Sequence, residues 1–285
     1  MSNRNKYPQE KPTERALICQ MSRAWELDHW LDYPTPEAVD PTPFLEVRNR
    51  LQLPTGVGWA FATAVECNWK WQSRTLETLS PYWVWREANR KSGISTEMQH
   101  ASVVSAAWVT MNAGVCSEAM CPYPELGAWI HDWAPQGPQC DNAEKRRSAL
   151  VDLRTARTPL QASREWVARH GTIVLSVQGQ VKWNRDGTAM EYIERPERQT
   201  DHPSVMALVG YAPRGNELPD FIVAGCRGRE WGCQGYGFLP WNLLLKILVD
   251  QRSILLGLAM WGSRAELRKW SAERFSAMSR QRMRA

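Results

Sequence analysis

A loop that runs into a strongly apolar helix constrains this chain more than any other stretch. Pro54, Gly56 and Gly58 interrupt regular backbone, and from Trp59 to Trp71 nothing breaks a helix. Apolar side chains fall on nearly every side of that helix, at positions 59, 60, 61, 62, 64, 65, 67, 69 and 71. A helix that is apolar all round is buried. We therefore predict a central helix that other parts of the chain cover on most sides.

The length and composition allow a sizeable core. A chain of 285 residues can form one large domain or two lobes around a cleft. Its 43% apolar and 23% charged residues are typical of a globular protein, and some of its 16 tryptophans are expected to line a groove.

The positive charge is unevenly placed along the chain. Residues 264–285 hold seven Lys or Arg and two Glu, so this tail alone carries +5, the net charge of the whole chain. A generally basic surface for nucleic acid is therefore not indicated. The tail is expected to be a solvated helix face, and it could also contact an acidic partner, nucleic acid or a membrane surface.

The cysteines and histidines indicate neither disulfides nor a metal site. Residues 1–11 are polar and lack an apolar signal core, so we expect a cytoplasmic protein with reduced thiols. Cys116 and Cys121 flank a turn, but no histidine stands near them at ligand spacing. We expect no metal and no cofactor. The apolar run from Trp241 to Trp261 is interrupted by charges, which favours a buried or partner-facing helix over a membrane span.

The helix start resembles the nucleophile segment of papain-like cysteine peptidases, whose pattern is Q-G-x-C-G-S-C-W-A-F. With Trp59-Ala60-Phe61 set on W-A-F, Gln52 takes the place of the oxyanion-hole glutamine and Gly58 that of the nucleophilic cysteine. That chemistry needs a thiolate at a helix N-terminus beside an imidazolium, which together lower the pKa of the thiol. Glycine brings no sulfur, so the resemblance implies that the nucleophile is missing.

Two later segments resemble the family's remaining motifs. Residues 204–211 are similar to H-A-V-x-x-V-G-Y, with Ser204 at the base position and His202 two residues upstream. Residues i and i−2 of a strand share a face, so His202 can still face a cleft and act as the base. The alternative is that His202 is an ordinary loop histidine without a catalytic role. Residues 225–236 are similar to N-S-W-G-x-x-W-G-x-x-G-Y, in which Gly225 replaces the orienting asparagine and Arg227 the first tryptophan, while Trp231 is kept.

The resemblance covers about residues 30–250, includes a bacterial-type G-Y-G-x-L-P segment, and implies an α+β, two-lobed papain-like fold. A helical lobe around the central helix is expected over about 44–158, and an antiparallel, barrel-like β lobe over about 159–240 together with an extended N-terminal segment. Residues 1–29 are expected to be a polar segment, with a short helix from Ala16 to Trp30, and residues 251–285 a basic helical extension. Other expected elements are helices at 83–90, 98–113, 143–152 and 160–170 and a strand at 172–177.

The altered motif positions lead to three functional hypotheses. The first is a catalytically inactive peptidase homologue that binds a protein or peptide, because loss of a nucleophile and base typically costs about a million-fold in turnover. The second is a thiol hydrolase or transferase that uses Cys226 with His202, against which Cys226 can be a small buried thiol. The third is a structural subunit that packs on neighbours through its C-terminal helices. The residues expected to bind a partner are Gln52, Trp59, His202, Arg227 and Trp231.

Overall fold

The computed structural model describes residues 35–49, 54–73, 75–93, 100–124, 135–193, 203–214, 218–250 and 252–260. The helices are η2 (Thr42–Phe44), α2 (Gly56–Ser73), α3 (Pro81–Lys91), α4 (Val103–Asn112), α5 (Gly137–Glu144), η3 (Leu153–Thr155), α6 (Pro159–Arg169) and α7 (Trp241–Val249). The strands are β1 (Ser148–Asp152), β2 (Thr172–Val177), β3 (Gln180–Trp183), β4 (Ala189–Ile193), β5 (Ser204–Ala212), β6 (Asp220–Ala224), β7 (Tyr236–Leu239) and β8 (Ile254–Met260).

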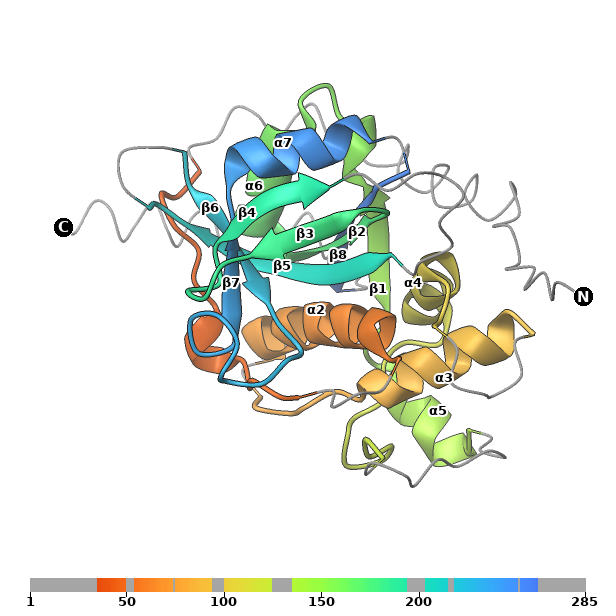
Figure 1. Ribbon diagram of the computed structural model, residues 1–285. Helices are drawn as coiled ribbons and strands as arrows, with labels where there is room; N and C mark the ends of the chain where they lie inside the picture. The colour runs from red at the N-terminus through yellow and green to blue at the C-terminus, as the bar shows by residue number, and fades with distance from the viewer. Residues whose placement is uncertain are drawn as a thin grey trace, which may run out of the picture.

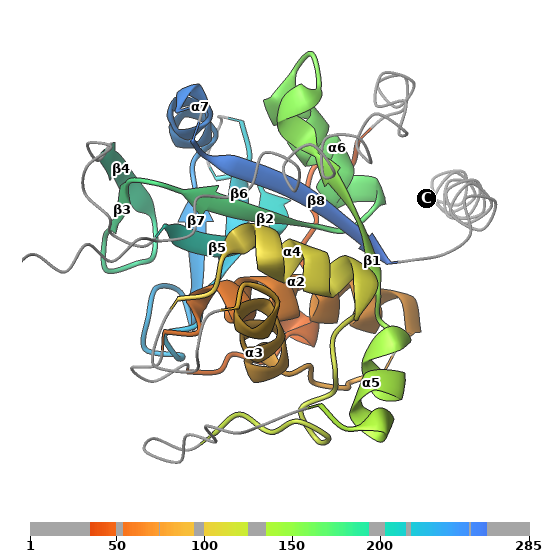
Figure 2. The ribbon, with the colours of Figure 1, turned by 90° about the vertical axis from the view of Figure 1, so that its right-hand side faces the viewer.

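These elements form three layers, which confirms the α+β fold. Helices α2 to α5 lie on one side of the main sheet, and α6 and α7 lie on the other (Figures 1 and 2). Helix α2 lies directly against the sheet, as predicted for the central helix. Twelve of its residues are buried, and ten of these precede Asn68, so the N-terminal part of the helix is the most deeply buried. It packs on α3 as well as on β2, β5 and β8.

The main sheet has six strands in the order β1-β8-β2-β5-β6-β7, and all neighbouring pairs are antiparallel. Strands β3 and β4 form a separate hairpin. Because successive side chains of a strand point to opposite faces, the central strands contribute to two cores. In β5, Ala207 and Val209 join the core with α2 to α4, whereas Met206 and Leu208 join the core with α6 and α7.

The segment before α2 connects the two sides of the molecule. Val39 exchanges two backbone hydrogen bonds with Tyr211 of β5, at 2.8 and 2.9 Å. Further along, the side chain of Arg48 reaches Glu66 of α2, with Nη2 and Oε2 3.0 Å apart. The segment therefore contacts both the sheet and the helical lobe within ten residues.

Most of the expected helices and the expected strand are present. Helices α3, α4 and α6 and strand β2 confirm the expectations for 83–90, 98–113, 160–170 and 172–177. Gly114 follows α4 with φ of +79°, the left-handed conformation that favours glycine after a helix.

Two expectations for the chain after residue 143 were wrong. The helix expected at 143–152 is instead the end of α5, a charged turn and strand β1, so the helical lobe does not extend to residue 158. The helical extension expected from residue 251 begins instead with β8, which lies between β1 and β2 in the sheet. Both faces of β8 are buried, so its sequence is a continuous apolar run that periodicity cannot distinguish from a buried helix. Residues 261–285 lie outside the described residues.

Candidate functional site

The first turn of α2 is closed by its neighbour α3. A Cβ placed on Gly58 would lie 2.3 Å from the carbonyl oxygen of Pro81 and 3.0 Å from Cβ of Trp85. Cβ contacts below 3.0 Å essentially do not occur. Because Pro81 begins α3 and Trp85 is fully buried, the close approach of the two helices leaves no room for a side chain at residue 58.

The side of α2 that faces the sheet is a different one. Ala64 accepts a hydrogen bond from Oγ1 of Thr172 at 3.0 Å, and Asn68 bonds to the backbone of Thr172 and Leu258 at 3.0 and 2.9 Å. Val57 lies three helical turns before Asn68 and therefore on the same side, while Gly58 is turned about 100° away. Val57 is buried and has no reactive group.

The hydroxyl of Thr55, just before this turn, is already engaged. Oγ1 of Thr55 lies 2.6 Å from the hydroxyl of Tyr123, and Thr55 is fully buried. Its carbonyl oxygen accepts the backbone N–H of Trp59 at 2.9 Å, the first hydrogen bond of the helix. Residues 54–58 therefore present no free sulfur or hydroxyl.

Ser204, which the sequence motif predicts at the base position, points away from α2. It is the first residue of β5 and pairs with Val177 of β2, and directly opposite residues of an antiparallel pair share a face. Val177 belongs to the core with α6 and α7. The neighbouring Val205, which packs against the core with α2, is the residue on the opposite face. Gly58 and Ser204 are thus not brought together.

Gly225, which the sequence motif predicts at the orienting position, is covered by Trp231. A Cβ on Gly225 would lie 2.4 Å from the indole of Trp231, and the backbone N–H of Gly225 donates to the carbonyl of Gly235 at 3.1 Å. The Trp231 ring meets Trp183 edge-on, with centroids 5.3 Å apart. The guanidinium of Arg227, an exposed residue, lies 5.8 Å from the same indole. An asparagine at residue 225 would require Trp231 to move.

The other predicted site residues are either buried to different degrees or lie outside the described residues. Gln52 and His202 lie outside the described residues, so the proposed pairing of Cys226 with His202 stays a prediction. Cys226 is half-buried in the bend after β6. Trp59 is buried, which removes it from the set of residues that could touch a partner directly.

A buried charge cluster beside Trp59 was not predicted from the sequence. Glu66 of α2 is held by Nη2 of Arg48 at 3.0 Å, by Nζ of Lys70 at 2.7 Å and by the backbone N–H of Leu79 at 2.9 Å. Arg48 also pairs with Glu118, and its guanidinium lies 4.7 Å from the centre of the Trp59 ring. The signal that could have found this cluster is a glutamate in a helix that is otherwise apolar on every side, since a buried charge needs partners.

The environment of Glu118 and of the buried cysteines favours the uncharged forms of their side chains. Burial raises the pKa of Glu118, while Arg48 beside it acts in the opposite direction. Burial also raises the pKa of Cys67 and Cys116 to about 12 and that of Cys121 to about 11. These three thiols are protonated at neutral pH and are poor nucleophiles, because the thiolate is the reactive form.

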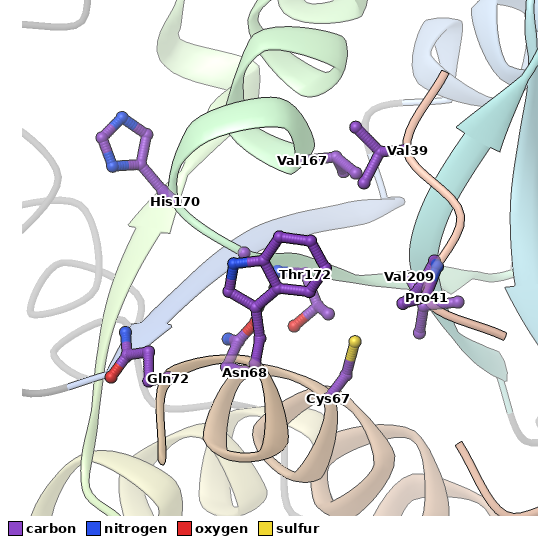
Figure 3. A pocket seen from close by; sticks show the side chains of 11 residues that line it. Val39, Pro41, Cys67, Asn68, Gln72, Val167, His170, Thr172 and Val209 are labelled. Atoms are coloured by element: carbon purple, nitrogen blue, oxygen red, sulfur yellow. Dashed lines mark hydrogen bonds between the residues drawn. The ribbon is translucent and has the colours of Figure 1, made fainter. Parts of the chain in front are cut away.

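A small pocket with a cavity volume of about 30 Å³ lies between the last turns of α2 and the end of α6 (Figure 3). Cys67, Asn68, Trp71 and Gln72 line it from α2, and Val167 of α6 and His170 just after α6 line it from the other side. The rest of the wall consists of Val39 and Pro41 of the N-terminal segment and of Gly171, Thr172 and Val209. Figure 3 shows Cys67 and His170 on opposite sides of the pocket, with Asn68 and Thr172 between them, so they do not form a thiol–imidazole pair. We call this cavity the α2–α6 pocket.

Metal-binding and membrane-spanning features are not found in the described ranges. Their His, Cys, Asp and Glu side chains nowhere gather in groups of three that could hold a metal ion. None of the described helices combines the length and hydropathy that crossing a bilayer requires.

Comparisons with known proteins identify a matching family and solved structures with a similar fold. A family model described as papain family cysteine protease matches residues 36–242. Among solved structures, xylellain, a cysteine protease from Xylella fastidiosa, is similar with a TM-score of 0.61 and 16% identity, over 80% of this chain and 88% of that one. Digestive procathepsin L 3 from the larval midgut of Tenebrio molitor has a TM-score of 0.58 and 17% identity, over 81% of this chain and 72% of that one.

A plant enzyme is similar to the same extent. Bromelain from Ananas comosus, solved in complex with the E64 inhibitor, has a TM-score of 0.55 and 18% identity, over 79% of this chain and all of that one. At these identities the likeness to solved structures concerns the fold. A search of curated proteins found no match.

Proposed function

Because the chain belongs to the papain family of cysteine proteases, we propose that it no longer hydrolyses peptide bonds and instead binds a protein or a peptide. The observation that carries this proposal is the steric closure of two motif positions. Pro81 and Trp85 leave no room for a side chain at Gly58, and Trp231 leaves none at Gly225.

The chemistry of the neighbouring groups supports the same proposal. Val57 is the sheet-facing residue of the first turn of α2, and the hydroxyl of Thr55 is bonded to Tyr123. Ser204 lies on the opposite face of the sheet from α2. Without a nucleophile and base in contact, turnover is expected to fall by about a million-fold from that of an active enzyme.

The catalytic half of the proposal is tested with the full chain and fluorogenic peptide substrates. We expect no turnover above background, and no adduct in the intact mass after treatment with an epoxide inhibitor such as E64. Turnover that disappears in Cys226→Ser would overturn the proposal in favour of the thiol hydrolase or transferase. His202→Ala then tests whether that histidine is the base.

The binding half is tested with a displayed library of random peptides. The exposed guanidinium of Arg227 and the half-buried Trp231 are the binding candidates within the described residues. We expect an enriched peptide whose affinity falls about tenfold in Arg227→Ala, the cost of one charge-assisted contact. Met190→Ala, at an exposed position on β4, is the matched control. A library that yields no binder, or binders insensitive to Arg227, would overturn this half.

We also propose a reduced, cytoplasmic setting. None of the six cysteines in the described ranges forms a disulfide, and three of them are buried. Thiols that stay reduced are typical of cytosolic proteins. An intact mass unchanged by a reducing agent after purification from cells is the expected result.

The third hypothesis, a structural subunit, depends on the C-terminal residues. Residues 264–285 carry a net charge of +5 and are the candidates for contact with an acidic partner, nucleic acid or a membrane surface. Deleting residues 263–285 and measuring the mass in solution tests an assembly role. An unchanged mass and an unchanged set of bound partners would exclude it.

A further inference from the structure

The α2–α6 pocket has an exposed aromatic rim. Trp71 is 45% exposed and Phe44 is 53% exposed, and their rings meet edge-on with centroids 6.5 Å apart. Val39, Pro41 and Val167 continue this apolar surface into the pocket. Contiguous exposed apolar side chains are typical of interaction surfaces.

Two polar side chains of the pocket, Asn68 and Thr172, are engaged within the protein. Both polar atoms of the Asn68 side chain bond to backbone groups of β2 and β8, and Oγ1 of Thr172 donates to Ala64. The thiol of Cys67 stays neutral because burial raises its pKa to about 12. The pocket is too small to hold a side chain, and its exposed rim of Trp71 and Phe44 favours an apolar contact over a charged ligand.

The pocket lies where the described part of the chain begins. The first described residue is Thr35, and Val39 and Pro41, a few residues later, form part of the pocket wall. Thirty-four residues precede that point. Among them, Leu17, Met21 and Trp25 stand four residues apart, the spacing that places side chains on one side of a helix.

The connection is long enough for these residues to reach the pocket. Eight residues separate Trp30 from Val39, and an extended chain spans about 3.3 Å per residue, or roughly 26 Å in all. A tether of this length holds the two surfaces at an effective concentration of about a millimolar. An apolar contact that is weak between separate molecules is therefore expected to be populated within one chain.

We propose that residues Ala16–Trp30 of this chain bind the rim of the α2–α6 pocket, with the side that carries Leu17, Met21 and Trp25 against Trp71 and Phe44. The binding covers the exposed aromatic rim with apolar side chains of the same molecule. This inference is independent of the proposed loss of peptidase activity, since the pocket lies at the opposite end of α2 from Gly58.

Limited trypsin digestion of the full chain tests the proposal, because Arg23 lies in the middle of the segment and Arg4 lies near the N-terminus. Mass spectrometry follows cleavage at each arginine. We expect slow cleavage at Arg23, and an increase of about tenfold in Trp71→Ala and in Trp25→Ala. Cleavage at Arg4 is expected to be equal in all variants. Phe44→Ala serves as a second pocket variant in case Trp71→Ala does not fold.

A double variant and a remote control decide the outcome. If the segment binds the pocket, Trp25→Ala combined with Trp71→Ala raises cleavage at Arg23 no further than either single change. Leu245→Ala, at an exposed apolar position on α7, leaves the rate unchanged. Additive effects, or equal cleavage in the parent and Trp71→Ala, would overturn the proposal. Protection that grows with protein concentration would overturn it in favour of a second copy of the chain.

Discussion

Replacing Gly58 with alanine offers the most direct test of the closed helix start. On an exposed helix this change stabilises a protein by about 0.5–1 kcal/mol, because alanine loses less conformational entropy on folding. Here the added Cβ would lie 2.3 Å from the carbonyl oxygen of Pro81 and 3.0 Å from Cβ of Trp85. The structure therefore reverses the sign that helix propensity predicts.

The size of the effect depends on how far α3 can move. Trp83, Val84 and Trp85 are at most 1% exposed, and Nε1 of Trp83 donates to the carbonyl of Gly114 at 3.1 Å. A helix held in this way cannot shift without disturbing the core on its other side. Overpacking of a core typically costs about 1–3 kcal/mol, so we expect Gly58→Ala to lose a net 1–3 kcal/mol and Gly58→Cys at least as much.

Urea denaturation followed by circular dichroism measures these losses. For a chain of this size, 1 kcal/mol lowers the melting temperature by about 2–4 °C. Gln72→Ala, at an exposed position of the same helix, is the control and should change the free energy of unfolding by less than about 0.5 kcal/mol. A Gly58→Ala variant as stable as the parent, or more stable, would refute the steric argument. A Gly58→Cys variant that folds normally and reacts with E64 would refute it as well.

Three further changes probe the buried polar groups. Glu66→Ala leaves Arg48 and Lys70 without their shared buried carboxylate, and we expect denaturation to show a loss of about 3–5 kcal/mol. Asn68→Ala removes the link from α2 to β2 and β8, and the buried backbone groups left unpaired should cost about 2–4 kcal/mol by the same measurement. Asp250, whose pKa is lowered to about 2 by hydrogen bonds from the Arg252 side chain and then from Tyr192, should make Asp250→Asn less stable than the parent at pH 6. Because a lowered carboxyl pKa stabilises the fold only while the group is ionised, this difference should shrink below the ordinary pKa of 3.8 and vanish near pH 2.

The controls for these changes come from the surface. Lys182 and Glu191 form an ion pair at 3.0 Å with both side chains more than half exposed, so Glu191→Ala should cost less than about 1 kcal/mol. A Glu66→Ala loss no larger than this would show that the buried cluster does not hold α2. A stability difference for Asp250→Asn that stays constant from pH 6 to pH 2 would contradict the assigned pKa shift.

Much of the fold could be predicted from the sequence because its signals are local. The uninterrupted apolar run after Gly58 predicts the buried helix α2, and the helix–Gly171–strand sequence predicts α6 and β2. The spacing of glycines and tryptophans in three separated motifs indicated the papain-like fold that the family match shows. The prediction was wrong at residues 148–152 and 254–260, which form strands β1 and β8 with residues buried on both faces. Such strands lack the alternation that distinguishes a strand from a buried helix.

For the candidate site too, the sequence determines the residue types, and the tertiary structure determines their surroundings. The residue types at positions 58, 204 and 225 are a property of the sequence, and they alone show that none is a cysteine, a histidine or an asparagine. Whether a side chain could be accommodated at Gly58 or Gly225 depends on Pro81, Trp85 and Trp231, which approach these positions only in the folded chain. The direction of Ser204, the partners of Glu66 and the pocket between α2 and α6 likewise depend on strand register and helix packing. These are contacts between residues far apart in the sequence, and local propensities carry no information about them.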